Sequence, residues 1–341
     1  MPKVSVILPV YNCEQYILES VQSVLNQSFF DFELLIIDDC STDNTLAIIN
    51  EFKDSRIKLI LKEKNTGYTD SLNYAISIAK GQYIARMDGD DICLPNRFEK
   101  QVAFLDENPK IILCGTAIQI IGTPRIFRHP SNHENIKVKL CFGNSFYHPS
   151  VMGRIEVFQA NPYDKTYEPA EDYDLWTRLA FQGELANLEE VLLMYRVHNS
   201  QVSNERKSLQ YKSSLRCKLN MLAFFKLLNN YDKDTINIFI GKKQPSSFLD
   251  CEQMLLISNF LIAINREYKF FDLLEFEKKI TKHKLIKIKS FITKDRFLKF
   301  ETYLFFIKSC SFKDFIKIVD VKKRSKAFFY EKKYYHSRSY R

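Results

Sequence analysis

Residues 4–14 read VSVILPVYNCE, a nearly continuous apolar run that ends at Pro9 and a polar turn. An apolar run without alternation is typical of a strand that is buried on both faces. Apolar residues at helical spacing follow in residues 14–27. The opening stretch therefore predicts a strand followed by a helix, which is the repeating unit of an α/β fold.

The same alternation continues through the first 120 residues. Further strands are predicted at residues 32–37, 57–61 and 83–87. Helical patterns lie between them, at residues 41–52 and 67–80. This order indicates a parallel sheet whose strands are joined by crossover helices. The later, looser pattern predicts strands at residues 111–121, 150–152 and 191–197 and a helix at residues 174–182.

Charge is unevenly distributed along the 341 residues, whose formal net charge is +9. Residues 201–341 hold 31 Lys and Arg against 14 Asp and Glu, whereas residues 1–200 hold 19 against 27. Helical patterns continue throughout the sequence beyond Ser203. We therefore expect an α/β domain at residues 1–203 and a basic, aromatic-rich helical region at residues 204–341.

The eight cysteines form neither a C-x-x-C pair nor a zinc-like spacing. Residues 1–10 show no secretory signal pattern, so we expect a reduced, cytoplasmic setting. No apolar stretch reaches the roughly 18 residues that span a bilayer, and the closest, residues 254–264, is interrupted by Ser258 and Asn259. An integral membrane protein is not expected, while binding to a membrane surface stays open.

Several widespread catalytic motifs are missing from the sequence. It contains no P-loop, no G-x-S-x-G, no H-E-x-x-H and no G-x-G-x-x-G after the first strand. The commonest ATPase, hydrolase, zinc-protease and dinucleotide-dehydrogenase classes are therefore excluded.

Polar residues follow each of the four predicted strands. In chain order they are Tyr11, Asn12, Glu14, Asp38, Asp39, Asn65, Gly67, Asp88, Asp90 and Asp91. Because ligands of parallel α/β sheets bind beyond the carboxyl ends of the strands, we expect these residues to line one binding site. Crowded carboxylates indicate a bound cation or a ligand that donates hydrogen bonds.

The segment MDGDD, residues 87–91, offers a metal site directly after the fourth strand. Two carboxylates separated by one residue can bind one Mn²⁺ or Mg²⁺, and such an ion often bridges to substrate phosphates. An isolated D-x-D is more often a solvated turn or a helix cap. Its place at a strand end, opposite the pair Asp38 and Asp39, favours the metal site.

Other polar residues have a functional and a structural interpretation. Asp38 or Asp39 can accept the N3–H of a uracil ring, or cap a turn. Tyr11 can stack on a base, or only end a strand. The acidic run that includes Asp172 contains more carboxylates than a helix cap needs, so one of them can act as a general base. His198 can complete the metal site, although a lone histidine is more often structural.

Five segments, in this order and spacing, resemble glycosyltransferase family 2. They are VSVILPVYNCE (4–14), LLIIDDCSTDNT (34–45), NTG (65–67), YIARMDGDDICLPNR (83–97) and EDYDLW (171–176). The resemblance spans roughly residues 3–203 and is closest to members that build bacterial capsule, exopolysaccharide or lipopolysaccharide O-chains. It implies an α/β fold of the GT-A (Rossmann-like) type, a mixed sheet flanked by helices, here with a C-terminal helical appendage.

The resemblance also implies roles for individual residues. Nucleotide-binding positions fall on Pro9, Tyr11, Asp38, Asp39, Asn65, Gly67 and Asp88. Metal-binding positions fall on Asp88, Asp90 and His198, and the catalytic base falls on Asp172. Two positions depart from the family pattern. Cys40 stands where Gly is frequent, and Ser71-Leu72 replaces Ala-Arg, so that a phosphate contact would have to come from Arg86 or Arg196.

The implied reaction is an inverting transfer of a hexosyl or N-acetylhexosaminyl group from a nucleotide-sugar, expected to be a UDP-sugar, to a saccharide acceptor. Mn²⁺ or Mg²⁺ is the implied cofactor. Acceptors in this family are often lipid-linked at the inner leaflet. The basic, aromatic residues 278–299 and 321–341 therefore indicate an anionic membrane surface as partner. A solvated charged face is the structural alternative, and nucleic acid is not expected.

Two other functions stay open. A nucleotidyltransferase that makes nucleotide sugars would share the α/β core and the acidic site, but it normally has a Gly-rich basic loop where residues 11–14 lie. A catalytically degenerate scaffold of a polysaccharide assembly complex would have no need of Asp88, Asp90 and Asp172.

Overall fold

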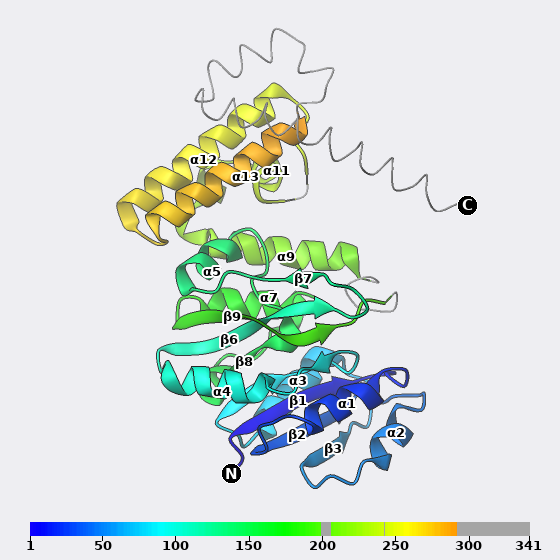
Figure 1. Ribbon diagram of the computed structural model, residues 1–341. Helices are drawn as coiled ribbons and strands as arrows, with labels where there is room; N and C mark the ends of the chain where they lie inside the picture. Colours follow the sequence, from blue (N-terminus) through cyan, green and yellow to red (C-terminus); the bar gives the residue numbers. More distant parts are fainter. Residues whose placement is uncertain (199–205, 242, 292–341) are drawn as a thin grey trace, which may run out of the picture. The chain divides into compact units, whose positions relative to one another are not determined.

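The structure is a computed structural model that describes residues 1–198, 206–241 and 243–291 (Figure 1). By its internal contacts the chain divides into two compact units, Met1–Met221 and Leu222–Arg341. The first unit contains the sheet and the acidic segments singled out above, and the second is helical where it is described.

A mixed sheet forms the centre of the first unit. Its strand order in the described residues is β3-β2-β1-β4-β8-β6-β9-β5, with β7 paired to β6. The strands are β1 (Val4–Val10), β2 (Phe32–Asp38), β3 (Ile57–Leu61), β4 (Tyr83–Arg86), β5 (Ile92–Cys93), β6 (Ile111–Ile120), β7 (Ile126–Phe127), β8 (Met152–Arg154) and β9 (Glu184–Tyr195). Strands β1 to β4 pair in parallel, whereas β8 runs antiparallel to both β4 and β6. The predicted α/β class with a mixed sheet is confirmed.

Helices flank this sheet. They are α1 (Ile17–Leu25), α2 (Thr45–Glu51), α3 (Tyr68–Ile78), α4 (Arg97–Glu107), α5 (His133–Leu140), α6 (Ile155–Ala160), α7 (Glu171–Leu179) and α9 (Lys207–Met221), with short 3₁₀ turns η1 (His148–Ser150) and η2 (Lys165–Tyr167). The helix predicted at residues 174–182 begins three residues earlier, at Glu171. Acidic residues are favoured in a first helical turn, and this start places Asp172 at the amino end of α7.

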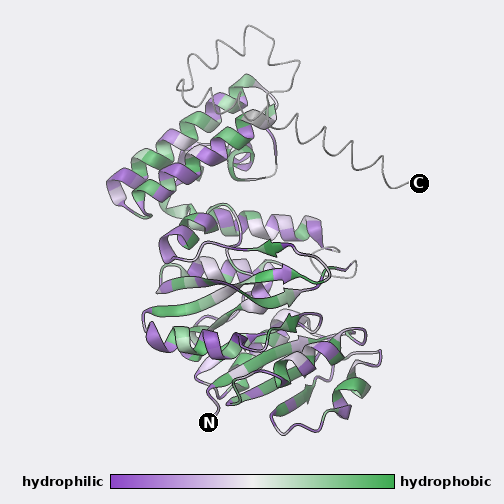
Figure 2. Cartoon of the chain, viewed as in Figure 1, coloured by the Kyte–Doolittle hydropathy of each residue, from purple (hydrophilic) through white to green (hydrophobic). Residues whose placement is uncertain are grey.

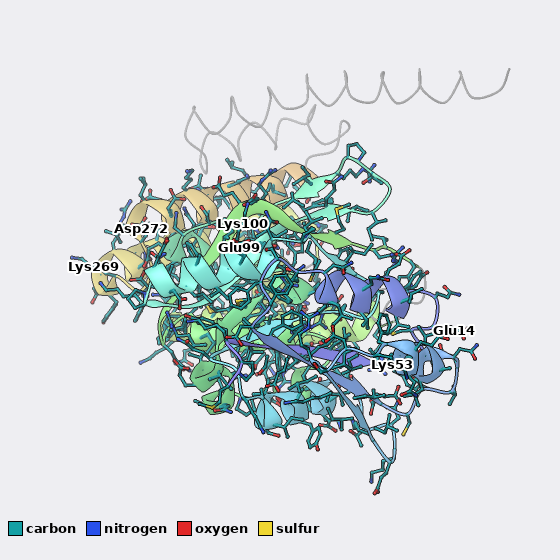
Figure 3. All side chains as sticks on the ribbon, turned by 60° about the horizontal axis from the view of Figure 1, so that its bottom comes forward. Glu14, Lys53, Glu99, Lys100, Lys269 and Asp272 are labelled. Atoms are coloured by element: carbon teal, nitrogen blue, oxygen red, sulfur yellow. The ribbon has the colours of Figure 1, made fainter. Side chains whose placement is uncertain are left out.

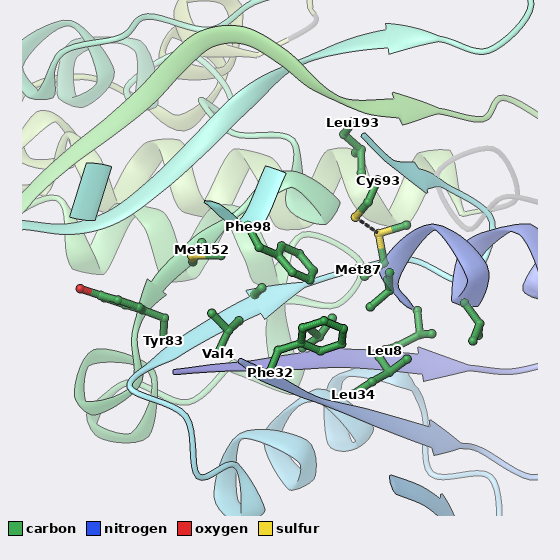
Figure 4. Packing of buried hydrophobic residues seen from close by; sticks show 14 of the residues in the cluster. Val4, Leu8, Phe32, Leu34, Tyr83, Met87, Cys93, Phe98, Met152 and Leu193 are labelled. Carbon is green, nitrogen blue, oxygen red and sulfur yellow. Dashed lines mark hydrogen bonds between the residues drawn. The ribbon is translucent and has the colours of Figure 1, made fainter. Parts of the chain in front are cut away.

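The core of the first unit lies between β1, β2 and β4 and the helices α1 and α4 (Figure 4). Alternate residues of β1 reach this cluster, and the rings of Phe32 and Phe98 meet edge to face at 5.7 Å. The sulfur atoms of Met87 and Cys93 lie 3.3 Å apart beside them. Burial of each side chain of this size contributes about 1.5–3 kcal/mol to the free energy of unfolding. The packing of these side chains also fixes the strand ends relative to one another.

Left-handed residues turn the chain at the carboxyl edge of the sheet. Asn12 follows β1 with φ +51°, Cys40 follows β2 with φ +64°, and Gly67 precedes α3 with φ +94°. Glycine adopts this conformation without steric cost, which explains why it is frequent at the position of Cys40. Val10 and Asp38 are register partners, so these turns lie side by side.

Charged side chains lie on the outer faces of the helices, while the strands are largely apolar (Figures 2 and 3). Glu99 and Lys100 are neighbours on α4, where Glu99 accepts a hydrogen bond from Ser28 at 2.6 Å and Lys100 pairs with Glu190. These contacts join α4 to its surroundings at the rim of the sheet.

The second unit contains, in its described part, η3 (Ala223–Phe225), α10 (Leu227–Asn230), α11 (Lys233–Ile240), α12 (Phe248–Tyr268) and α13 (Leu273–Phe291). Helices α12 and α13 pack together and are joined by the turn that holds Lys269 and Asp272 (Figure 3). The Asn265 side chain bonds both backbone groups of Phe271 and so fixes this turn.

Helix α12 is, in the described residues, the one helix long and apolar enough to cross a membrane by length and composition. Core helices pass the same test, and 39% of its most apolar window is buried within the protein. The finding is therefore weak evidence for a membrane span.

Candidate active site

Three carboxylates gather directly after β4. Asp88, Asp90 and Asp91 each place one oxygen within 4.8 Å of the others. Strand β4 ends at Arg86 and β5 begins at Ile92, so a short turn between two anchored strands holds the three side chains. The cluster stands at the carboxyl edge of the parallel strands, where the sequence predicted a metal site.

Electrostatics show that this cluster needs compensating positive charge. Burial raises the pKa of Asp88, and the charge of Asp90 adds to this effect, while the ion pair with Arg86 opposes it. Burial also raises the pKa of Asp91 well above its usual value, and the charges of Asp88 and Asp90 raise it further. Crowded carboxylates of this kind bind a cation readily.

The residues present fit a divalent metal ion. Their ligand atoms are carboxylate oxygens, which Mg²⁺ and Mn²⁺ prefer, together with one imidazole. Oδ2 of Asp91 is buried and has no hydrogen-bond partner among the described residues. Nε2 of His198 lies 2.8 Å from Oδ2 of Asp90, so the histidine predicted to complete the site does lie at it.

Arg196 holds the end of β9 against the acidic turn. Its backbone N–H donates to Asp91 at 2.9 Å, its Nε donates to the Asp90 carbonyl at 2.8 Å, and its guanidinium pairs with Glu19 at 2.5 Å. These contacts fix the position of His198, two residues further along. Arg196, which the sequence offered as a phosphate contact, thus has a structural role in this arrangement.

Asp38 and Asp39 follow β2 but differ in what they contact. Asp39 accepts from the backbone N–H groups of Thr66 and Gly67 at 3.0 and 2.9 Å and pairs with Lys62 at 2.6 Å. It therefore ties β2 to the turn before α3. Asp38 accepts from the Ser41 N–H at 3.1 Å, and its other oxygen, Oδ1, is buried with no partner in the described part of the chain. Of the two, Asp38 therefore keeps one acceptor oxygen without a protein partner in the described residues.

The remaining predicted nucleotide-binding residues frame the same edge. Pro9 is buried within β1, and the Tyr11 side chain is 48% exposed just beyond it. Oδ1 of Asn65 accepts from the Gly67 N–H at 3.2 Å and shapes the turn before α3. Tyr11 thus offers an accessible ring, while Pro9, Asn65 and Gly67 contribute backbone shape.

Asp172 lies in the first turn of α7 with both oxygens hydrogen-bonded. Asn144 Nδ2 donates to Oδ2 at 2.7 Å, and the Tyr173 N–H donates to Oδ1 at 2.6 Å. Burial raises the pKa of Asp172, and these two donors and the charge of Arg86 hold the rise in check. A carboxylate held by two N–H donors, with its pKa raised by burial, is suited to general-base work.

Arg86 connects the two acidic groups. It is buried, pairs with Asp88 and lies over the Tyr68 ring with its Cζ 6.0 Å from the ring centroid. Its charge lowers the pKa of both Asp88 and Asp172. The acidic turn after β4 and the candidate base are therefore both within the electrostatic reach of this guanidinium.

A set of side chains beside Asp172 was not predicted as part of the site. Glu171 contacts the Tyr68 hydroxyl, which lies 3.4 Å from Nδ1 of His148, and Nε2 of His148 lies 2.9 Å from the Tyr163 hydroxyl. Local sequence gave no signal for Tyr68 and Tyr163, because their partners are about 100 and 15 residues away. The acidic run around Glu171 and the histidine in His148-Pro149-Ser150 were the hints that the sequence gave.

Comparison with known proteins places this geometry in context. The family model described as Glycosyl transferase family 2 matches residues 5–173. An uncharacterized glycosyltransferase of Haemophilus influenzae is 35% identical over 240 residues, which cover 66% of this chain and 74% of the relative. The O-antigen biosynthesis glycosyltransferase WbnJ of Escherichia coli is 35% identical over 61% of this chain and 84% of its own length.

Two further proteins carry informative names. The UDP-Glc:alpha-D-GlcNAc-diphosphoundecaprenol beta-1,3-glucosyltransferase WfaP of Escherichia coli is 33% identical over 67% of this chain and 91% of its own length. Among solved structures, S. aureus TarS 1–349 in complex with UDP-GlcNAc aligns with a TM-score of 0.53 at 20% identity, covering 85% of this chain and 80% of that one. At that identity the likeness to TarS shows a shared fold.

Proposed function

The chain belongs to glycosyltransferase family 2 and has the GT-A fold, and from this premise we propose that it is a metal-dependent, inverting glycosyltransferase. Its donor in this proposal is a UDP-sugar, and its acceptor is a glycan or lipid-linked saccharide of a cell-surface polysaccharide. The observation that carries the proposal is the cluster of Asp88, Asp90 and Asp91 with His198 at the carboxyl edge of the sheet.

The acidic turn supports the metal-dependent part of the proposal. Asp88, Asp90 and His198 would hold Mn²⁺ or Mg²⁺, with Asp91 beside them. When bound there, the ion supplies positive charge that stabilises the nucleoside diphosphate leaving group. Arg86, buried next to Asp88, contributes a second and permanent positive charge.

Asp172 supports the inverting part. In the proposed single displacement, its carboxylate takes the proton of an acceptor hydroxyl while the hydroxyl oxygen forms a bond to the anomeric carbon. The bond from that carbon to the diphosphate oxygen breaks on the opposite face, and the nucleoside diphosphate leaves with the electron pair. An α-linked donor would thus give a β-linked product. Asn144 and the Tyr173 N–H orient the base for this step.

The donor and acceptor classes rest on relatives and on two side chains. WfaP is named for a UDP-glucose donor and a diphosphoundecaprenol-linked acceptor, and TarS was solved with UDP-GlcNAc. The free Oδ1 of Asp38 suits the N3–H of uracil, a donor that cytosine lacks. Tyr11 suits stacking on the base.

A thermal-shift panel of UDP, GDP, CMP and dTDP, each with and without Mn²⁺, tests this function. A ligand at about 100 times its Kd stabilises the folded protein by about 2.7 kcal/mol. We expect stabilisation by UDP that requires Mn²⁺ and is lost in Asp90→Ala, but kept in the surface control Glu190→Ala. Stronger stabilisation by GDP or dTDP than by UDP would contradict the proposed donor class. No response to any nucleotide would favour the scaffold function.

We also propose that the enzyme works at the cytoplasmic face of a membrane, with residues 204–341 as the basic contact region. In α13 the residues Leu274, Lys278, Lys282 and Ile286 are exposed at intervals of four, so lysines and apolar side chains share one face. The basic stretch 321–341 and residues 292–299 of the other basic stretch lie outside the described residues.

Co-sedimentation with anionic vesicles tests the membrane contact. Each basic residue near an anionic surface contributes about 1 kcal/mol, so Lys278→Glu/Lys282→Glu should weaken binding at least about 30-fold. The matched control is Lys53→Glu/Lys64→Glu, two exposed lysines of the first unit. Equal binding by both double variants would contradict the assignment of this face.

A further inference from the structure

Two carboxyl groups that are neighbours in the chain stand together at the start of α7. Glu171 is buried, with 2% of its surface exposed, and Asp172 is partly buried beside it. Two such groups at close quarters do not ionise together without strong compensation. The charge of Asp172 disfavours a second anion at Glu171, so the location of a proton decides which of the two residues can act as a base.

The hydrogen bonds of the two groups are unequal. Both oxygens of Asp172 accept N–H donors, from Asn144 and from the Tyr173 backbone. Glu171 has one contact, between Oε1 and the Tyr68 hydroxyl, and its Oε2 is buried without a partner among the described residues. A buried anionic oxygen without a donor is far more costly than a neutral carboxyl oxygen in the same place.

The hydrogen bonds around Tyr68 are compatible with a neutral Glu171. The Tyr68 hydroxyl donates to Oε1, which is then the carbonyl oxygen of the acid, with the proton on Oε2, and the Tyr68 oxygen accepts from Nδ1–H of His148 at 3.4 Å. Nε2 of His148 then accepts from the Tyr163 hydroxyl, at 2.9 Å. This requires a neutral imidazole, and burial together with the charge of Arg86 does lower the pKa of His148 well below its usual value.

We propose that Glu171 is a positioning residue that holds the proton, anchored by Tyr68, His148 and Tyr163, and thereby keeps Asp172 as the ionised member of the pair and the base of the transfer reaction. This inference rests on the proposed function for its chemistry. Its physical part, a neutral Glu171 beside an ionised Asp172, is independent of which sugar is transferred.

The groups that face Glu171 are consistent with this assignment. Asp172 and Glu168 bring negative charge toward it, which disfavours a further anion. Glu168 is itself paired with Arg206, and Arg86 lies over the far side of Tyr68. Burial, with the charge of Asp172, raises the pKa of Glu171 to about 8, so that it ionises only above neutral pH.

A matched pair of variants separates the two possible assignments. Gln resembles a neutral Glu, so Glu171→Gln should reduce kcat/KM less than about tenfold, whereas Asp172→Asn should reduce it about 1,000-fold. The opposite order, or equal losses, would overturn the proposal. Glu171→Ala, which removes the anchor, should lose about 100-fold.

The pH profile supplies a readout that a merely structural role would not move. Wild-type kcat/KM should fall above about pH 8, where Glu171 ionises, while Glu171→Gln should lack this alkaline limb and keep the acid limb of Asp172. Tyr68→Phe should shift the alkaline limb, and Tyr74→Phe, an exposed tyrosine on the same helix, should not. Superimposable profiles of wild type and Glu171→Gln would refute the inference.

Infrared spectroscopy of the ligand-free protein at neutral pH tests the position of the proton without relying on transferase activity, so it tests this inference separately from the proposed function. A protonated carboxyl group absorbs at a different infrared frequency from an ionised carboxylate. We expect the difference spectrum of wild type minus Glu171→Gln to contain such a band, and that of wild type minus Asp172→Asn to lack it. If the band is present and no donor is turned over, the proposed function fails and the proton assignment stands. If the difference spectrum for Glu171→Gln lacks the band, the assignment fails whatever the activity.

Discussion

Replacing Glu171 by Gln should change how stability depends on pH, because the substitution removes one buried titratable group. The pKa of Glu171 is raised from 4.5 to about 8 in the folded protein by burial and by the charge of Asp172. Below about pH 4.5 the residue is protonated in both the folded and the unfolded chain. Between these two values the unfolded chain releases the proton and the folded protein keeps it, so the wild type loses stability as pH rises.

The size of the effect follows from the shift. Each pKa unit corresponds to 1.36 kcal/mol, so the wild type should lose about 1.4 kcal/mol per pH unit relative to Glu171→Gln, to a total of about 5 kcal/mol once the pH exceeds about 8. Above that pH the difference should stay constant. Differences in packing between Glu and Gln add an offset that does not vary with pH.

Urea unfolding followed by tryptophan fluorescence is a suitable assay. Trp176 is the only tryptophan in the sequence, is fully buried and lies in the first unit, so its signal reports the unit that contains Glu171. Glu51→Gln, an exposed carboxyl group on α2, controls for the loss of one charge. Parallel stability curves for wild type and Glu171→Gln between about pH 5 and pH 8 would refute the reasoning.

Three further predictions test the site and the core. Asp38→Ala should weaken UDP binding about tenfold to 100-fold in calorimetry but leave CDP binding nearly unchanged, since it removes the acceptor for uracil N3–H; equal losses would contradict that role. Asp39→Ala should lower the free energy of unfolding by about 3 kcal/mol, because two backbone donors and Lys62 lose their partner. A loss under about 1 kcal/mol in urea unfolding would show that these contacts contribute little to stability. Phe98→Ala should cost about 3–5 kcal/mol in the same assay, whereas Phe30→Ala, 74% exposed, should cost less than about 0.5 kcal/mol; similar costs would contradict the described core.

Local sequence was sufficient for the elements that depend on short apolar runs. The strand predicted at residues 57–61 is β3 with the same bounds, and the strand predicted at the start of residues 4–14 is β1, Val4–Val10. Strand β9 begins at Glu184, seven residues before the predicted start, because polar residues interrupt its apolar pattern. Helix α4 was not predicted, although its buried Phe98, Val102 and Leu105 follow helical spacing.

The acidic site could also be predicted from the sequence. Asp88, Asp90 and Asp91 follow a strand, and the rule that parallel strands gather their carboxyl ends at one edge is enough to bring them near the turns after β1 and β2. The different roles of Asp38 and Asp39 could not be predicted from the sequence. They depend on which of the two side chains accepts hydrogen bonds from the backbone of residues 66 and 67, and no periodic pattern in the sequence indicates that contact.

The sequence by itself determined the α/β class, the parallel strands β1 to β4 and the acidic turn, because apolar periodicity and turn chemistry act between near neighbours. Only the tertiary structure decided the antiparallel insertion of β8, the burial of Arg86 between two acidic groups, and the contact of Tyr68 with Glu171 across 103 residues. Those features depend on long-range packing and on the solvent that packing excludes. The same exclusion of solvent raises the pKa of Glu171, a value that no stretch of sequence states.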